Sequence, residues 1–130
     1  MIINLHFMAR VLSIKELENE YKNNDLDGIY LIKINNMTYT GLIRNISNGT
    51  IFMDLPLKFS RNDNPMYTPT VIEPEEFREC KEVPLEGHIR AVTKKDGIIE
   101  GDIMEVYNNR IIIKADEIKT VYYQDLYDVE

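Results

Sequence analysis

The chain has 130 residues, a formal net charge of −7 and a sequence pI near 4.9. Eight basic and eleven acidic residues lie in positions 1–80, and seven and eleven follow, so both halves are acidic. Nonspecific nucleic-acid affinity depends on basic residues that release phosphate counterions, so this composition argues against nonspecific DNA or RNA binding. The single cysteine, Cys80, excludes an intrachain disulfide and a thiolate-rich metal site, and favours a reducing, cytoplasmic compartment.

Residues 1–27 are expected to form an N-terminal segment that contains one helix. The first seven residues are apolar, but this stretch is too short for a signal-peptide core or a membrane span, so we expect no membrane association. Either Met1 or Met8 fits as the natural start.

A capping box, Ser13-x-x-Glu16, predicts a helix over about residues 14–23. Its apolar residues, Ile14, Leu17 and Tyr21, follow one stripe, and its other face is acidic. The pattern is typical of an amphipathic helix lying on a β structure and not of a nucleic-acid recognition helix.

The rest of the chain repeats itself at an offset of about sixty residues. Residues 28–34, 39–46 and 50–54 resemble residues 87–93, 99–106 and 110–114. Internal repetition of this kind predicts two copies of one small unit, which we place at residues 28–84 and 85–130. A unit of about sixty residues is marginal alone, so the copies should pack on each other or on a second chain.

Turn signals separate runs rich in Ile, Val, Tyr and Thr in both copies. The turns fall at residues 35–36, 47–49, 95–97 and 108–109, where Asn-Gly, Asp-Gly or Asn-Asn pairs tolerate the positive φ of tight hairpins. Each copy therefore reads as a three-stranded antiparallel meander, followed by a tight turn and a final strand at 77–83 or 118–123. Gly41 and Gly101 lie inside the long second strands and indicate bends or bulges.

This arrangement resembles the Sm-like and Src-homology-3-like small barrels. The resemblance covers about a hundred residues and rests on the glycine-containing second strands, residues 36–41 and 96–101. It implies a mainly β fold in which an N-terminal helix precedes two tandem antiparallel β-barrels. The residues that carry RNA in Sm-like proteins have no match at positions 47–49 or 107–109, so the resemblance does not imply RNA binding.

The first copy contains a segment, residues 55–69, that the second copy lacks, and we expect it to be a long structureless loop that carries function. Cations, aromatic rings and amides there could hold a phosphate and a base, contact a partner protein, or simply line a solvated loop. The candidate binding residues are six from this segment and Arg110 of the second copy: Lys58, Phe59, Arg61, Asn62, Asn64, Tyr67 and Arg110.

Catalytic constellations are not apparent in the sequence. His6 and His88 are the only histidines, the serines lack a neighbouring His/Asp pattern, and no glycine-rich phosphate loop is present. We therefore expect no catalytic residue, no metal site and no cofactor. Paired carboxylates such as Glu75/Glu76 are expected to cap turns.

The C-terminal residues 122–129 are too rich in tyrosine and aliphatic side chains to stay in water. They should dock on their own barrel or on another subunit, and with exposed strand edges they suggest a homo-oligomer.

Three functional hypotheses follow. The first is a non-catalytic cytoplasmic binding protein of bacterial or phage origin that acts on a host protein through loop 55–69 and the seam between the repeats. The second is sequestration or sensing of a nucleotide or another phosphorylated small molecule in pockets between subunits, with Lys58, Arg61 and Arg110 as phosphate ligands. The third is a metal-dependent carboxylate enzyme, for which no spacing of acidic residues offers support.

Overall fold

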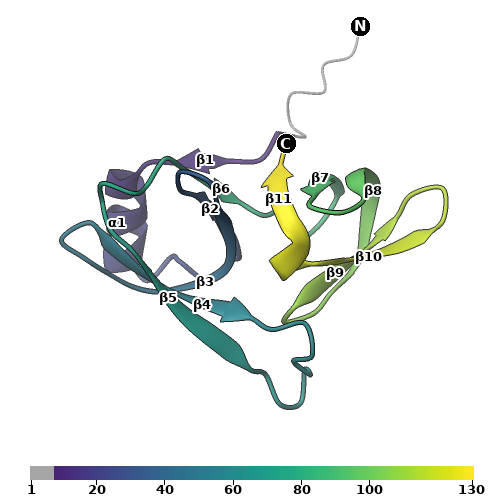
Figure 1. The fold of residues 1–130 in the computed structure, drawn as a ribbon, viewed down its shortest axis with the longest axis horizontal. Helices are drawn as coiled ribbons and strands as arrows, with labels where there is room; N and C mark the ends of the chain where they lie inside the picture. Colours follow the sequence, from purple (N-terminus) through teal and green to yellow (C-terminus); the bar gives the residue numbers. More distant parts are fainter. Residues whose placement is uncertain (1–7) are drawn as a thin grey trace, which may run out of the picture.

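The computed structural model describes residues 8–130 and shows a mainly β protein with two antiparallel sheets and one helix (Figure 1). The first half contains β1 (Val11–Leu12), α1 (Ile14–Lys22), β2 (Tyr30–Lys33), β3 (Thr38–Ser47), β4 (Thr50–Pro56), β5 (Tyr67–Ile72) and β6 (Glu79–Glu82). The second half contains β7 (His88–Thr93), β8 (Gly97–Val106), β9 (Arg110–Lys114), β10 (Ile118–Tyr122), the 3₁₀ turn η2 (Tyr123–Asp125) and β11 (Leu126–Val129).

The predicted capping box starts helix α1. The Ser13 hydroxyl accepts a hydrogen bond from the Glu16 backbone amide at 3.1 Å, and the Glu16 carboxylate accepts one from the Ser13 amide at 2.9 Å. Asn23 caps the other end, and Asn24 then turns the chain with a φ of 59°. Leu17 is fully buried against the first sheet, so the apolar stripe fixes the helix on that sheet.

The two halves share one strand order. The six-stranded sheet has the order β1-β6-β2-β3-β4-β5, and the five-stranded sheet has the order β10-β9-β8-β7-β11. With the N-terminal strand β1 left aside, the last strand of each half returns to pair beside the first, β6 beside β2 and β11 beside β7. The hairpins β3–β4 and β8–β9 also share a register at an offset of sixty residues. Leu42 lies opposite Asp54 in the first hairpin, and the equivalent residue Asp102 lies opposite Lys114 in the second.

The long strands β3 and β8 each change partner along their length. Both register shifts come at equivalent points, between Ile43 and Asn45 and between Ile103 and Glu105. Two residues earlier, a Cβ on Gly41 or Gly101 would overlap a backbone carbonyl of the next strand. Glycine is required there because the neighbouring backbones approach too closely for any side chain, and the bulge that follows bends the strand.

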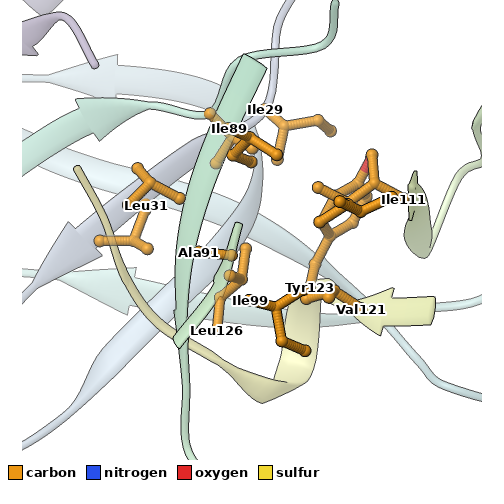
Figure 2. Packing of buried hydrophobic residues seen from close by; sticks show 12 residues of the cluster. Ile29, Leu31, Ile89, Ala91, Ile99, Ile111, Val121, Tyr123 and Leu126 are labelled. Carbon is orange, nitrogen blue, oxygen red and sulfur yellow. The ribbon is translucent and has the colours of Figure 1, made fainter. Parts of the chain in front are cut away.

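The halves share a core through β2. Leu31, together with Ile29 just before the strand, packs with the buried residues of the second sheet (Figure 2), whereas Tyr30 and Ile32 face the core of the first sheet and helix α1. Alternate residues of a strand point to opposite faces, so this one strand joins both clusters. A fully buried leucine contributes about 2 kcal/mol through the hydrophobic effect, which makes separate folding of the halves unfavourable.

An ion cluster joins the halves beside this shared strand. The Asp128 carboxylate of β11 lies 2.9 Å from the Lys33 ammonium of β2 and 3.0 Å from the Lys81 ammonium of β6. Partial burial alone would raise the pKa of Asp128, but the hydrogen bonds from Lys33 and Lys81 outweigh it, and the pKa lies below its ordinary value of 3.8.

Replacement of Asp128 by asparagine is expected to lower the free energy of unfolding at neutral pH by about 2 kcal/mol, because it removes two charge-assisted contacts. The lowered pKa means that this stabilisation is present above the ordinary value of 3.8 and is lost as the pH falls through the lower folded value. Urea unfolding followed from neutral to acidic pH should therefore show a shallower acid loss for Asp128→Asn than for the wild type. Parallel acid profiles would show that the cluster adds nothing.

Three expectations about the β units need correction. Neither sheet closes into a barrel, so two tandem closed barrels are not confirmed. The connection at the end of the β4–β5 hairpin is instead bonded to the second half at Asn108 and Asn109. Each repeat also has five strands and not four, β2–β6 and β7–β11, because β5 and β11 lie within segments that the sequence indicated to be a loop and a tail.

The predicted structureless loop 55–69 is shorter than expected. Its two ends belong to β4 and β5, which pair from Ile51↔Ile72 to Pro56↔Tyr67, so only residues 57–66 connect strands. Pro56 and Pro69 suggested a break in secondary structure, but both are accommodated in this edge hairpin.

Candidate functional site

A pocket lies at the seam between the halves, where β3 and β4 separate. These strands pair only from Leu42↔Asp54 to Ser47↔Thr50, and beyond that point the end of β4 leaves the start of β3. The 3₁₀ turn η2 of the second half packs against both strands at the opening. A space of about 250 Å³ remains, lined by Met37, Thr38, Tyr39, Thr40, Leu55, Pro56, Leu57, Thr68, Lys94, Tyr123 and Gln124. We call it the seam pocket.

The seam pocket is mainly apolar, with a few polar groups. Thr40 is 4% exposed, and its hydroxyl has no hydrogen-bond partner among residues 8–130. Tyr123 is buried in the second core, where burial raises the pKa of its phenol, and its hydroxyl donates to the Tyr107 carbonyl at 3.1 Å. Lys94 donates to the Gln124 carbonyl at 2.9 Å at the edge of the pocket. An apolar space with few polar groups is typical of a binding site.

The segment 57–66 borders the pocket and is docked on the second half by Asn109. This side chain is 1% exposed, and its amide nitrogen lies within 3.1 Å of the carbonyl oxygens of Leu57, Lys58 and Ser60. Its amide oxygen accepts a hydrogen bond from Arg110 at 2.8 Å. One buried side chain therefore fixes the path of the loop.

A second set of hydrogen bonds supports this docking. The Asn108 amide group donates to the Ser60 hydroxyl at 2.8 Å, and the Asn108 backbone amide donates to the Asn62 side chain at 3.0 Å. The Ser60 hydroxyl also accepts from the Met66 amide at 2.8 Å, which closes the loop on itself. The 57–66 connection is an ordered element of the seam.

The structure gives each of the three predicted phosphate-binding cations a partner of its own. Lys58 pairs with Asp125 at 2.8 Å and lies 5.6 Å from the centre of the Tyr122 ring. Arg61 pairs with Asp63 at 3.1 Å on the exposed tip of the loop. Arg110 stacks on the Tyr107 ring at 4.1 Å. A phosphate would have to compete with these contacts.

The four other predicted binding residues have different environments. Phe59 is 68% exposed at the loop. Asn62 accepts the Asn108 amide, and Asn64 forms a small bridge with Arg61 at the loop tip. Tyr67 is half-buried at the start of β5, opposite Pro56. Of the seven predicted residues, none lines the seam pocket itself, although their neighbours Leu57 and Thr68 do.

Sequence reasoning missed Thr40, Lys94 and Asn109, which come from strands or turns that looked purely structural. A threonine in an alternating strand gives no sign that its hydroxyl lacks a partner, and Asn108-Asn109 reads only as a turn. The one available signal was the position of the unmatched segment 55–69 in the first copy, because a long hairpin connection needs something to hold it.

Within residues 8–130, the thiol is buried and the imidazole is paired with carboxylates. Burial raises the pKa of the Cys80 thiol to about 12, so the thiol stays protonated. His88 lies 2.8 Å from Glu100 and 3.2 Å from Asp102, and these carboxylates raise its pKa. Across this same part of the chain, no three or more His, Cys, Asp or Glu side chains are grouped to hold a metal ion.

None of the helices in the described part of the chain has both the length and the apolar character needed to cross a membrane.

Comparison of the chain with family models, curated proteins and solved structures gave no match.

Proposed function

We propose that this protein is a non-catalytic binding module made of two fused Sm-like or Src-homology-3-like units, and that the seam pocket receives an apolar side chain of a partner protein. The observation that carries the proposal is the pocket itself: an apolar space between the halves, with a buried threonine hydroxyl that has no partner within residues 8–130. Native proteins rarely leave such a hydroxyl unpaired, so a bound group that pairs with it would relieve a cost.

Duplication of one unit is supported by strand order and register. With β1 left aside, the strands lie in the equivalent orders β5-β4-β3-β2-β6 and β10-β9-β8-β7-β11. In both halves a turn precedes the last strand, β6 or β11. The close-approach glycines and the register shifts recur at an offset of sixty. Packing constraints alone would maintain these shared features, so we look for function where the halves differ, at the seam and the 57–66 connection.

The size of the pocket favours a side chain over a nucleotide. Pockets that bury small-molecule ligands usually have volumes of about 300–1,000 Å³. The seam pocket, at about 250 Å³, falls below that range, and its lining includes Leu55, Leu57 and Met37. One large apolar side chain with a hydrogen-bonding group fits this chemistry better than a base, sugar and phosphate.

An extended partner segment could reach the pocket along β5. This strand is the edge of the six-stranded sheet, and Thr68 in it lines the pocket. The Leu57 amide donates to the Met66 carbonyl, so the backbone groups of Met66 face β4. Hydrogen-bonding pairs alternate along an antiparallel ladder, and the backbone groups of Tyr67 and Val71 therefore point away from β4, toward the open edge. Pro69 removes one donor from this edge, so the pocket and not the ladder would supply most of the affinity.

Sequestration of a phosphorylated small molecule is the weaker proposal. Lys58, Arg61 and Arg110 each have a partner already, and the cation at the pocket, Lys94, donates to a carbonyl. Desolvating these cations without a gain in contacts would cost affinity.

The test uses peptides selected from a random library on the immobilised wild-type protein. We expect Thr40→Val to keep or raise the free energy of unfolding, by up to about 1 kcal/mol, because it removes a buried hydroxyl without a partner. The same variant should weaken binding of the selected peptides about tenfold, since the peptide loses a hydrogen bond in a desolvated site. Isothermal titration calorimetry measures the dissociation constants of the selected peptides for the wild type and for the variant.

Thr120→Val, at an exposed position of β10, is the matched control and should leave binding unchanged. Failure to select any peptide, or equal affinity for wild type and Thr40→Val, would contradict the assignment.

A further inference from the structure

The second half carries a groove at the same place in its fold as the seam pocket. The seam pocket is lined by residues 38–40 of β3 and 55–57 at the end of β4. The groove is lined by residues 98–100 of β8 and 115–117 after β9, which are the same positions at an offset of sixty, and by Lys119. Separation of the second and third strands creates both spaces.

The two spaces differ in what covers them. The other half closes the seam pocket with Tyr123, Gln124 and Lys94. All residues that line the groove belong to the second half, and its volume, about 480 Å³, is about twice that of the seam pocket. Within residues 8–130, therefore, no segment covers the groove in the way that Tyr123, Gln124 and Lys94 cover the seam pocket.

The groove combines an apolar floor with carboxylates. Ile98, 51% exposed, and Ala115 supply apolar surface, and Glu100, Asp116 and Glu117 supply the charges. Lys119 pairs with Glu117 at 2.9 Å and also attracts Asp116, and Glu100 pairs with His88 and with Arg90, at 3.6 Å. Within the described chain Asp116 forms no ion pair at 4.0 Å or less, and the lining has three carboxylates and one ammonium group.

A second copy of the chain is a poor occupant. The turn that corresponds to η2 in the first half, residues 73–77, contains Glu73, Glu75 and Glu76, and it would face the carboxylates of the groove. The ion pair that holds the seam, Lys58 with Asp125, has no equivalent either, because the residue sixty positions after Lys58 is Ile118. Like charges placed together oppose association.

We infer that this groove is a second binding site, which takes a short basic and apolar segment of a partner protein. The inference is independent of the seam pocket, because no residue is shared between the two linings. Lysine or arginine side chains would meet Asp116 and Glu117, and an apolar side chain would cover Ile98. Complementary charge then sets the choice of partner, and the apolar contact supplies part of the affinity.

The experiment titrates the whole ¹⁵N-labelled protein with three short synthetic peptides of equal length: alternating Lys and Leu, alternating Glu and Leu, and alternating Lys and Ser. We expect only the Lys/Leu peptide to bind well, and its amide chemical-shift changes should centre on Ile98, Ala115 and Asp116. The double variant Asp116→Asn/Glu117→Gln should weaken binding about tenfold. Thr40→Val should leave this binding unchanged, which separates the groove from the seam pocket.

The control double variant, Asp25→Asn/Asp27→Asn, removes the same charge from exposed carboxylates elsewhere and should change affinity less than twofold. Equal weakening by both double variants would mean that the peptide responds to the net charge of the protein and not to the groove, and would overturn the inference. Shift changes away from the groove would do the same. Shifts at Ile98 and Ala115 that appear on concentrating the protein alone would assign the groove to a second copy.

Discussion

Replacement of Gly101 by alanine is expected to lower the free energy of unfolding by about 3 kcal/mol or more. A Cβ at this position would overlap the carbonyl oxygen of Lys114 and crowd the Ile113 side chain. The carbonyl belongs to the backbone of β9, so it cannot move without breaking the ladder between β8 and β9. Gly41→Ala meets the Asp54 carbonyl in the same way and should be comparably destabilising. Urea unfolding monitored by circular dichroism measures both.

Gly28→Ala is the matched control, because its Cβ would approach the flexible Glu82 side chain at 3.3 Å, would meet the Tyr30 side chain only at an ordinary contact distance of 3.6 Å, and because its backbone needs no positive φ. Its effect should be within about 1 kcal/mol, and it can be stabilising, since alanine restricts the unfolded chain. Similar losses for Gly28→Ala and Gly101→Ala would mean that strand propensity, and not close backbone approach, explains the glycines.

Replacement of Asn109 by alanine is expected to cost about 3 kcal/mol as well. The change leaves the carbonyls of Leu57, Lys58 and Ser60 without their shared donor, and it removes the acceptor for Arg110. Buried acceptors that lose their partner cost the full desolvation penalty, and the 57–66 connection would lose its anchor. Hydrogen exchange should then be faster at the Ser60 and Met66 amides, which bond within the loop.

Asn45→Ala, at an exposed position of β3, controls for the loss of an asparagine side chain and should change stability by less than about 0.5 kcal/mol. Unchanged exchange rates in the loop of Asn109→Ala would contradict the anchoring role, whatever the effect on global stability. Binding of seam-pocket peptides should also weaken in this variant, because Leu57 lines the pocket.

Local sequence signals predicted the elements of this fold well, because each depends on neighbouring residues. The capping box placed the start of α1, and Asn48-Gly49 formed a turn with φ values of 52° and 81°. The mainly β class followed from alternation of apolar residues between such turns. These features depend on hydrogen bonds and dihedral preferences within a few residues.

Long-range pairing was harder to predict. β5 was concealed by two prolines and an Asn-rich connection, although proline is tolerated at a sheet edge. β11 read as an apolar tail, and its pairing with β7 joins residues far apart in the chain. Whether the sheets close could not be read from pattern either, because the pattern fixes strands and not their partners.

The predicted binding residues and the seam pocket are neighbours but have no residue in common. Charge and aromaticity drew attention to Lys58, Arg61 and Phe59, whereas the pocket lies beside them and is lined by Leu57, Thr68 and residues of β3. Ion pairs with Asp125 and Asp63 could not be foreseen, because they depend on how the halves meet and how the loop turns. A residue type suggests a chemistry, but only the fold shows whether the group is free to perform it.

The most direct test of the proposed seam site is a ¹⁵N–¹H titration of the full chain with a peptide selected on the wild-type protein. We expect the largest amide shift changes at residues 38–40, 55, 57, 94 and 124, which come from both halves and surround one pocket. The Thr40→Val variant should need about ten times more peptide to reach the same shift changes, in line with its tenfold weaker binding. Shift changes confined to one half and remote from these residues would contradict a binding site at the seam.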